Sequence, residues 1–115
     1  KKKMKVMDYA IKVGCDLNEI LQTAVDENDL IIVGKCLKHG ADINYIDEDG
    51  NSNALICAQN DNIPLLKSLV NKGMKLFYDN SYKSPLIAAI VNNSIGCVKI
   101  LLKIGIFLRD VTAKI

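Results

Sequence analysis

One phrase closes three segments of this chain at an almost constant spacing. Its fullest copy is Lys38-His39-Gly40-Ala41-Asp42-Ile43-Asn44, and shorter copies follow at Asn71-Lys72-Gly73-Met74-Lys75 and Lys103-Ile104-Gly105. The three glycines are separated by 33 and then by 32 residues. A fixed period of this length indicates a stacked repeat protein, in which each unit buries its apolar face against its neighbours. We therefore expect the 115 residues to form a single repeat domain.

Two short helices are predicted in each unit. In the first unit, a helix is expected from Leu21 to about Asn28, and Asp29 is a suitable N-cap for a second helix over residues 30–39. Gly40 can adopt the left-handed conformation that ends a helix. The apolar positions of the second helix share one helical face and are Ile32, Val33, Cys36 and Leu37.

The second and third units repeat this pair of helices. The residues that predict their N-termini, as caps or as first-turn prolines, are Ser52, Asn62, Pro64, Ser84 and Pro85. The last helix is expected to start after Asn93-Ser94 and to end at Gly105. Between units one and two, the polar segment 41–51 has turn formers at Asp49-Gly50 and is predicted to form an extended β-turn finger. The second finger, residues 74–83, lacks the corresponding glycine, so the same turn is not favoured there.

These units resemble the ankyrin repeat. Ser84-Pro85-Leu86-Ile87-Ala88-Ala89 is close to the family's TPLHxAA motif, and Gly40-Ala41-Asp42-Ile43-Asn44 matches its GADVN motif. The resemblance implies an all-α repeat fold, an ankyrin-type solenoid of antiparallel helix pairs joined by β-turn fingers. It also implies a non-enzymatic scaffold that binds other proteins. The motif's histidine is absent, so the Thr–His hydrogen bonds of the family cannot form; the residues in its place are Gln22, Leu55 and Ile87.

Four segments are expected along the single domain. Residues 1–20 are predicted to form an N-terminal cap or partial repeat, because the short stretch from Gly14 to Leu21 leaves no room for a first finger. The three repeats are then 21–51, 52–83 and 84–115, the last of which includes the C-terminal end.

No group of residues suits catalysis. His39 is the only histidine, and there is no glycine-rich phosphate loop. Asp42, Asp47 and Asp49 lack the closing Glu at the spacing that a calcium loop requires. None of the four cysteines forms a CxxC pair. By the repeat register, Cys36, Cys57 and Cys97 fall on core-facing helix positions, and we expect small buried residues in a reducing compartment. The sequence therefore predicts no enzyme activity, no cofactor and no metal site.

The distribution of charge limits the possible partners. The net charge of +2 combines +4 over residues 1–15, −8 over residues 16–61 and +6 over residues 62–115. With one arginine and few aromatic residues, the chain is not expected to bind nucleic acid.

No apolar run approaches the roughly 18 residues that span a bilayer, so no membrane role is expected. The abundance of Asn, Lys and Ile resembles that of viral, intracellular bacterial and protozoan ankyrin proteins. A cytoplasmic location is expected, in the host cytoplasm if the source is a virus or an intracellular bacterium.

A partner-binding surface is predicted where the fingers and the first helices line up. Its predicted contact residues are Asp26, Glu27, Tyr45, Ile46, Glu48, Asp49, Asn51, Gln59, Asn60, Asn80, Ser81, Lys83, Val91 and Asn92. The four acidic members are expected to form one patch beside Tyr45 and Ile46. Such a patch favours a protein partner with a basic surface, which it would steer by charge.

Assembly with further copies is the alternative function, as is an inhibitor or immunity-type role that uses the apolar C-terminal end. That end carries Ile106, Phe107 and Leu108. The apolar residues of the second finger, which could pack either on another copy or on the next unit of the same chain, are Met74, Leu76, Phe77 and Tyr78.

Overall fold

The structure is a computed structural model that describes residues 2–76 and 83–113 of the chain. Within these residues it is helical, with no strand. The helices are α1 (Lys2–Lys12), α2 (Leu17–Glu27), α3 (Leu30–Lys38), α4 (Asn53–Gln59), α5 (Ile63–Asn71), α6 (Pro85–Val91) and α7 (Ile95–Ala113). Side chains are described for residues 4–76 and 83–105.

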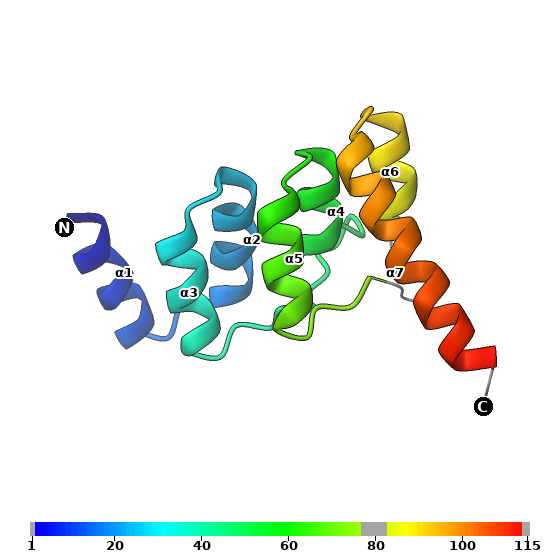
Figure 1. Ribbon diagram of the computed structural model, residues 1–115. Helices are drawn as coiled ribbons and strands as arrows, with labels where there is room; N and C mark the ends of the chain where they lie inside the picture. The colour runs from blue at the N-terminus through cyan, green and yellow to red at the C-terminus, as the bar shows by residue number, and fades with distance from the viewer. Residues whose placement is uncertain (1, 77–82, 114–115) are drawn as a thin grey trace.

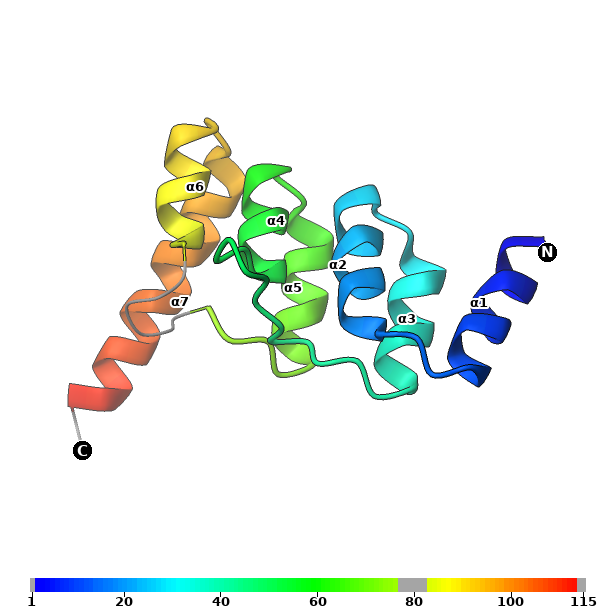
Figure 2. The ribbon, with the colours of Figure 1, turned by 180° about the vertical axis from the view of Figure 1, so that it is seen from behind.

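The helices form an elongated stack of 46 × 32 × 24 Å (Figure 1). Helices α2 and α3 make unit one, α4 and α5 make unit two, and α6 and α7 make unit three. The first helices of the units, α2, α4 and α6, lie side by side in one row, which faces the viewer in Figure 2. Helices α1, α3, α5 and α7 follow one another in the second row (Figure 1). The prediction of an all-α repeat solenoid is confirmed.

The predicted helix caps are present. The side-chain oxygens of Asp29, Ser52, Asn62 and Ser84 each accept a hydrogen bond from the backbone N–H three residues later, at 3.1–3.3 Å. The turn between the two helices of each unit contains one polar residue with positive φ, namely Asn28, Asp61 or Asn93. Asn and Asp tolerate this left-handed conformation better than other side chains do, which explains the sharp helix–turn–helix at these points.

Two helix limits differ from the predictions. Helix α2 begins at Leu17 and not at Leu21, because Asp16 accepts a hydrogen bond from the backbone N–H of Asn18 at 2.9 Å and so caps the helix earlier. Helix α7 continues past Gly105 to Ala113. Gly40 ends its helix with a φ of 97° and is followed by turn-forming residues. Gly105 is followed in the sequence by Ile, Phe and Leu, residue types whose side chains have no hydrogen-bonding group to compete with the helix.

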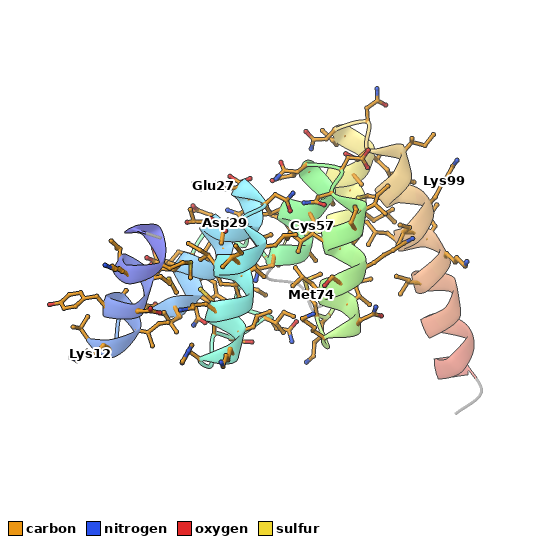
Figure 3. All side chains as sticks on the ribbon, turned by 60° about the vertical axis from the view of Figure 1, so that its left-hand side comes forward. Lys12, Glu27, Asp29, Cys57, Met74 and Lys99 are labelled. Atoms are coloured by element: carbon orange, nitrogen blue, oxygen red, sulfur yellow. The ribbon has the colours of Figure 1, made fainter. Side chains whose placement is uncertain are left out.

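The core runs through the whole stack, between the units as well as inside them. Fully buried side chains come from all three units and include Leu21, Cys36, Cys57, Leu66 and Cys97. Cys57 lies inside the stack, as Figure 3 shows. The predicted core position of three cysteines is therefore confirmed, and Cys15 is exposed.

The second finger begins by packing on its own chain. Met74 and Leu76 are buried in the hydrophobic core, so they are not available to another copy as the assembly alternative requires. Phe77 and Tyr78 lie outside the described residues, and so do the side chains of residues 106–108.

The first finger forms as predicted. The backbone N–H of Asp47 donates to the carbonyl of Asn51 at 3.1 Å, and an isolated antiparallel bridge joins Ile46 to Ser52. Gly50 turns the chain with a φ of 84°, a conformation that glycine adopts without steric cost.

A repeated asparagine bond joins the end phrases of successive units. Asn18 lies four residues after Gly14, and its side-chain oxygen accepts from the backbone N–H of Asp42 at 2.7 Å. Asn44 lies four residues after Gly40 and accepts in the same way from Lys75 at 2.8 Å. We call these two contacts the asparagine latches. The Asn18 latch ties the start of α2 to the chain that follows α3, and the Asn44 latch ties unit one to unit two.

Candidate functional site

A groove follows the row of first helices. It consists of two hollows that share Gln59, one of about 340 Å³ between α2 and α4 and one of about 390 Å³ between α4 and α6. We call the whole the inner groove. The lining of the first hollow is Gln22, Thr23, Asp26, Asp47, Asn51, Ile56 and Gln59. The lining of the second hollow is Leu55, Gln59, Lys83, Ser84, Ile87, Ala88, Val91 and Asn92.

The first hollow is polar and acidic, and its side chains are held by hydrogen bonds. Gln22 stands where the ankyrin motif has histidine, and its amide donates to the backbone carbonyl of Asn51 at 2.8 Å. The side-chain amide of Asn60 donates to the carboxylate of Asp26 at 3.0 Å and to its backbone carbonyl at 3.3 Å. These contacts tie α2 to the finger and to α4, so the acidic wall of the hollow is preorganised.

Asp47 organises the finger at the edge of this hollow. Its carboxylate accepts from the backbone N–H groups of Asp49 and Asn51 at 3.0 and 2.9 Å, and from the Asn51 side chain at 3.1 Å. Partial burial works to raise the pKa of Asp47, but the bonds from Asn51 and Asp49 and the charge of Lys83 outweigh it and hold the pKa below its usual value. Asp47 therefore remains charged, and Lys83 offsets part of that charge.

The second hollow is apolar. Its floor is the buried side chain of Leu55, and the wall from α6 carries Ile87 and Val91, which are 62% and 77% exposed. These two residues are one helical turn apart and therefore point from the same face of α6. Exposed apolar side chains that adjoin a hollow are typical of protein-binding surfaces.

The structure divides the predicted acidic patch. Asp26 lines the first hollow, whereas Glu27 lines a different hollow, on the side of α2 that faces away from α4. Successive helical residues point about 100° apart, which separates the two carboxylates. Glu48 and Asp49 are exposed on the finger. The acidic surface of the inner groove thus comes from Asp26 and the finger, without Glu27.

Tyr45 and Ile46 are both half-buried on the finger. Partial burial, followed by the charges of Glu19, Asp16, Asp47 and Glu48, raises the pKa of Tyr45. Tyr45 therefore stays protonated at neutral pH.

The remaining predicted contact residues differ in their availability. Gln59 and Val91 are exposed in the groove, while Asn51 and Asn60 are engaged within the fold, as described above. The side chain of Asn92 lines the second hollow and donates to the carbonyl of Ala88 at 2.9 Å. Asn80 and Ser81 lie outside the described residues.

Several residues of the inner groove were not predicted from the sequence. Asp47 carries a recognisable signal, because an Asp followed at short range by Asp49, Gly50 and Asn51 is typical of a side-chain-stabilised turn. Leu55 and Ile87 carry no such signal, because the same apolar residues could equally have packed inside the core. The packing of α4 against α6 places Leu55 on the floor of the second hollow and Ile87 on its wall, and this packing cannot be read from the sequence.

The described part of the chain offers no metal site, since no three of its His, Cys, Asp or Glu side chains are grouped to hold an ion. Burial raises the pKa of Cys57 to about 12 and that of Cys97 to about 11, so these thiols are poor nucleophiles at neutral pH. None of the helices, over the residues described, is long and apolar enough to cross a membrane.

The stacked helix pairs, the intervening finger and the two hollows that share Gln59 along one row define a helical-repeat binding scaffold. Residues 21–114 match the family described as Ankyrin repeats (3 copies), and the chain belongs to that family. Ankyrin repeats are generally protein–protein interaction modules. No curated protein matches the chain.

Proposed function

We propose that the inner groove binds a protein partner that presents basic side chains next to apolar ones. The observation that carries the proposal is the shared groove itself, in which an acidic hollow and an apolar hollow meet at Gln59. Protein interfaces commonly combine an apolar anchor with a polar rim. Here Ile87 and Val91 supply the apolar contact, and Asp26 and the finger supply the charge.

The two halves of the groove have different roles in this proposal. The exposed carboxylates attract a basic partner from a distance and raise its association rate, an effect that salt weakens. Ile87 and Val91 lose their exposed apolar surface when the partner binds, which slows its dissociation. Binding of this kind needs no covalent chemistry. The cytoplasmic location expected from the sequence is part of this proposal, because there the four cysteines would remain reduced.

The test uses two groove variants, each with a matched control. Glu48→Lys reverses one charge of the finger, and Glu27→Lys makes the same change on the far side of α2. Ile87→Ser/Val91→Ser removes the apolar wall. Its control, Leu30→Ser/Ile31→Ser, alters two equally exposed residues of α3.

A partner captured from a lysate by the native chain is then purified and its affinity measured for each variant. We expect each groove variant to weaken binding about tenfold or more, and each control to leave it unchanged. The finger variant should act mainly on the association rate. The proposal fails if the groove variants bind as tightly as the native chain, or if the controls weaken binding equally.

A further inference from the structure

The two rows of helices carry charge of opposite sign. Helix α2 and the first finger contain acidic residues and no lysine or arginine. Helices α3 and α5, in the second row, contain lysines and no acidic residue. We call the exposed side of the second row the outer face; it faces the viewer in Figure 1, and the inner groove lies on the opposite side, in Figure 2. The molecule therefore has an acidic side and a basic side.

The outer face is apolar where α3 begins. Leu30 and Ile31 are 59% and 67% exposed, although α3 has a neighbouring helix on each side in its row (Figure 1). Gly34 lies one turn further along the same side, and a Cβ added there would meet no atom within 4 Å. The next residue, Lys35, does not cover this area, because its side chain pairs with Asp8 of α1. We call the exposed group of Leu30, Ile31 and Gly34 the outer patch.

The outer face becomes basic in the next two units. The repeat register places Lys67 of α5 and Lys99 of α7 at the position that Gly34 has in α3. Both lysines are exposed, and Lys99 projects away from the stack in Figure 3. Lys103, one turn after Lys99, is exposed as well. Along the stack, the outer face thus changes from apolar on α3 to basic on α5 and α7.

The inner groove shows the complementary change in the reverse order. Its acidic hollow lies between α2 and α4, and its apolar hollow follows between α4 and α6. The outer face of one copy therefore matches the inner groove of another copy when the two stacks run in opposite directions. Leu30 and Ile31 then lie against Ile87 and Val91, and Lys67 lies over the acidic hollow. Within one chain the two faces point away from each other, so only separate copies can make this contact.

We infer that the protein bound by the inner groove is a second copy of this chain, which docks by its outer face; the inference rests on the proposed function. The outer patch supplies the apolar contact, and the lysines of α5 and α7 supply the charge that the acidic hollow attracts. The contact joins two different surfaces and is heterologous, so association continues beyond the dimer. Added salt should weaken it, because its charged groups are exposed.

The test is sedimentation of the full chain from about 1 μM to about 1 mM, the range in which weak association is measured. The native chain should reach masses above that of a dimer. Leu30→Ser/Ile31→Ser removes the outer patch, and Ile87→Ser/Val91→Ser removes the apolar wall of the groove; both change only exposed side chains. Each variant alone should self-associate about tenfold more weakly than the native chain.

An equimolar mixture of these two variants is the decisive sample. The first variant keeps an intact groove, and the second keeps an intact outer face. One native contact can therefore form between them, but neither chain can extend it. The mixture should give a one-to-one complex with the affinity of the native contact, and it should stop at the dimer.

Gly34 supplies an independent variant with a matched control. Gly34→Lys places in α3 the lysine that the register has in α5 and α7, and it should weaken association about tenfold, because a charge enters the apolar contact. Gly34→Ala keeps the outer patch apolar and should associate as the native chain does. Both side chains extend into open space and favour the helix more than glycine does, so the fold is retained.

Three results would overturn the inference: a native chain that is monomeric at every concentration, self-association that Ile87→Ser/Val91→Ser leaves unchanged, or a mixture that forms no complex. The proposed function is judged separately, by the affinity of a partner captured from a lysate. A monomeric chain whose captured partner is lost on Ile87→Ser/Val91→Ser refutes the second copy as partner and leaves the groove as a binding site.

Discussion

The asparagine latches make a prediction that can be quantified from the structure. Replacing Asn44 with Ala removes the acceptor for the backbone N–H of Lys75, a bond of 2.8 Å. This bond is exposed, so the freed N–H can bind water, and the expected loss is at least the net value of one hydrogen bond, about 1 kcal/mol. Asn18→Ala removes the equivalent bond of 2.7 Å to Asp42 and should cost about the same.

The assay is urea unfolding followed by circular dichroism, with thermal unfolding in parallel. For a chain of this length, a loss of about 1 kcal/mol lowers Tm by about 4 °C. The two latches meet at Asp42, which donates its backbone N–H to Asn18 and accepts from the backbone N–H of Asn44 at 2.8 Å. The double variant should therefore be less stable than either single variant, with a loss that departs from the simple sum of about 2 kcal/mol.

Asn71→Ala is the matched control, because Asn71 is an exposed residue near the end of α5. Alanine is the better helix former, so this control should be neutral or slightly stabilising. The reasoning is refuted if Asn44→Ala is as stable as the control. It is also refuted if the double variant is no less stable than either single one, since each latch is expected to stabilise the stack.

Three further predictions concern the free energy of unfolding and the cysteines. Gly34 lies inside α3 with open space around the position of an added Cβ, so Gly34→Ala should raise the free energy of unfolding by about 1 kcal/mol in urea. Of the four thiols only Cys15 is exposed, so a thiol reagent at neutral pH should modify one group per native chain and four in denaturant. Asp47 has a folded-state pKa below its unfolded value of about 3.8, so its charge stabilises the fold above that pH. This contribution should disappear as the pH falls through the folded-state pKa, and Asp47→Asn should show a smaller loss of stability in acid.

Much of the fold could be predicted because its local signals are short-range. A cap such as Ser52 or Asn62 needs only the N–H three residues later, and a turn at Gly50 needs only the conformational freedom of glycine. The C-terminal end of α7, at Ala113, could not be predicted from Gly105 alone. A glycine ends a helix only when the following residues offer an alternative to helical hydrogen bonds, and here the residues that follow are apolar.

The candidate site was less predictable because it depends on tertiary register. Asp26 and Glu27 are adjacent in sequence, and composition gives no reason to separate them. Their separation follows from which side of α2 faces α4, and that side is fixed by buried contacts such as those of Leu21 and Val25. The contact between Gln22 and the finger could not be predicted for the same reason, because its hydrogen bond to the carbonyl of Asn51 joins residues 29 positions apart.

The two halves of the inner groove lie at junctions that are held together differently. The acidic half lies between units one and two, which the Asn44 latch joins. The apolar half lies between units two and three, where the position equivalent to Asn44 is Phe77, a residue with no side-chain acceptor. That junction depends on packing and on bonds such as that from the backbone N–H of Cys97 to Asp61, at 3.3 Å. A partner in the apolar hollow would contact Ile87 and Val91 of α6 and Leu55 of α4 together. Its binding would therefore also stabilise the packing of unit three on unit two, which has no asparagine latch.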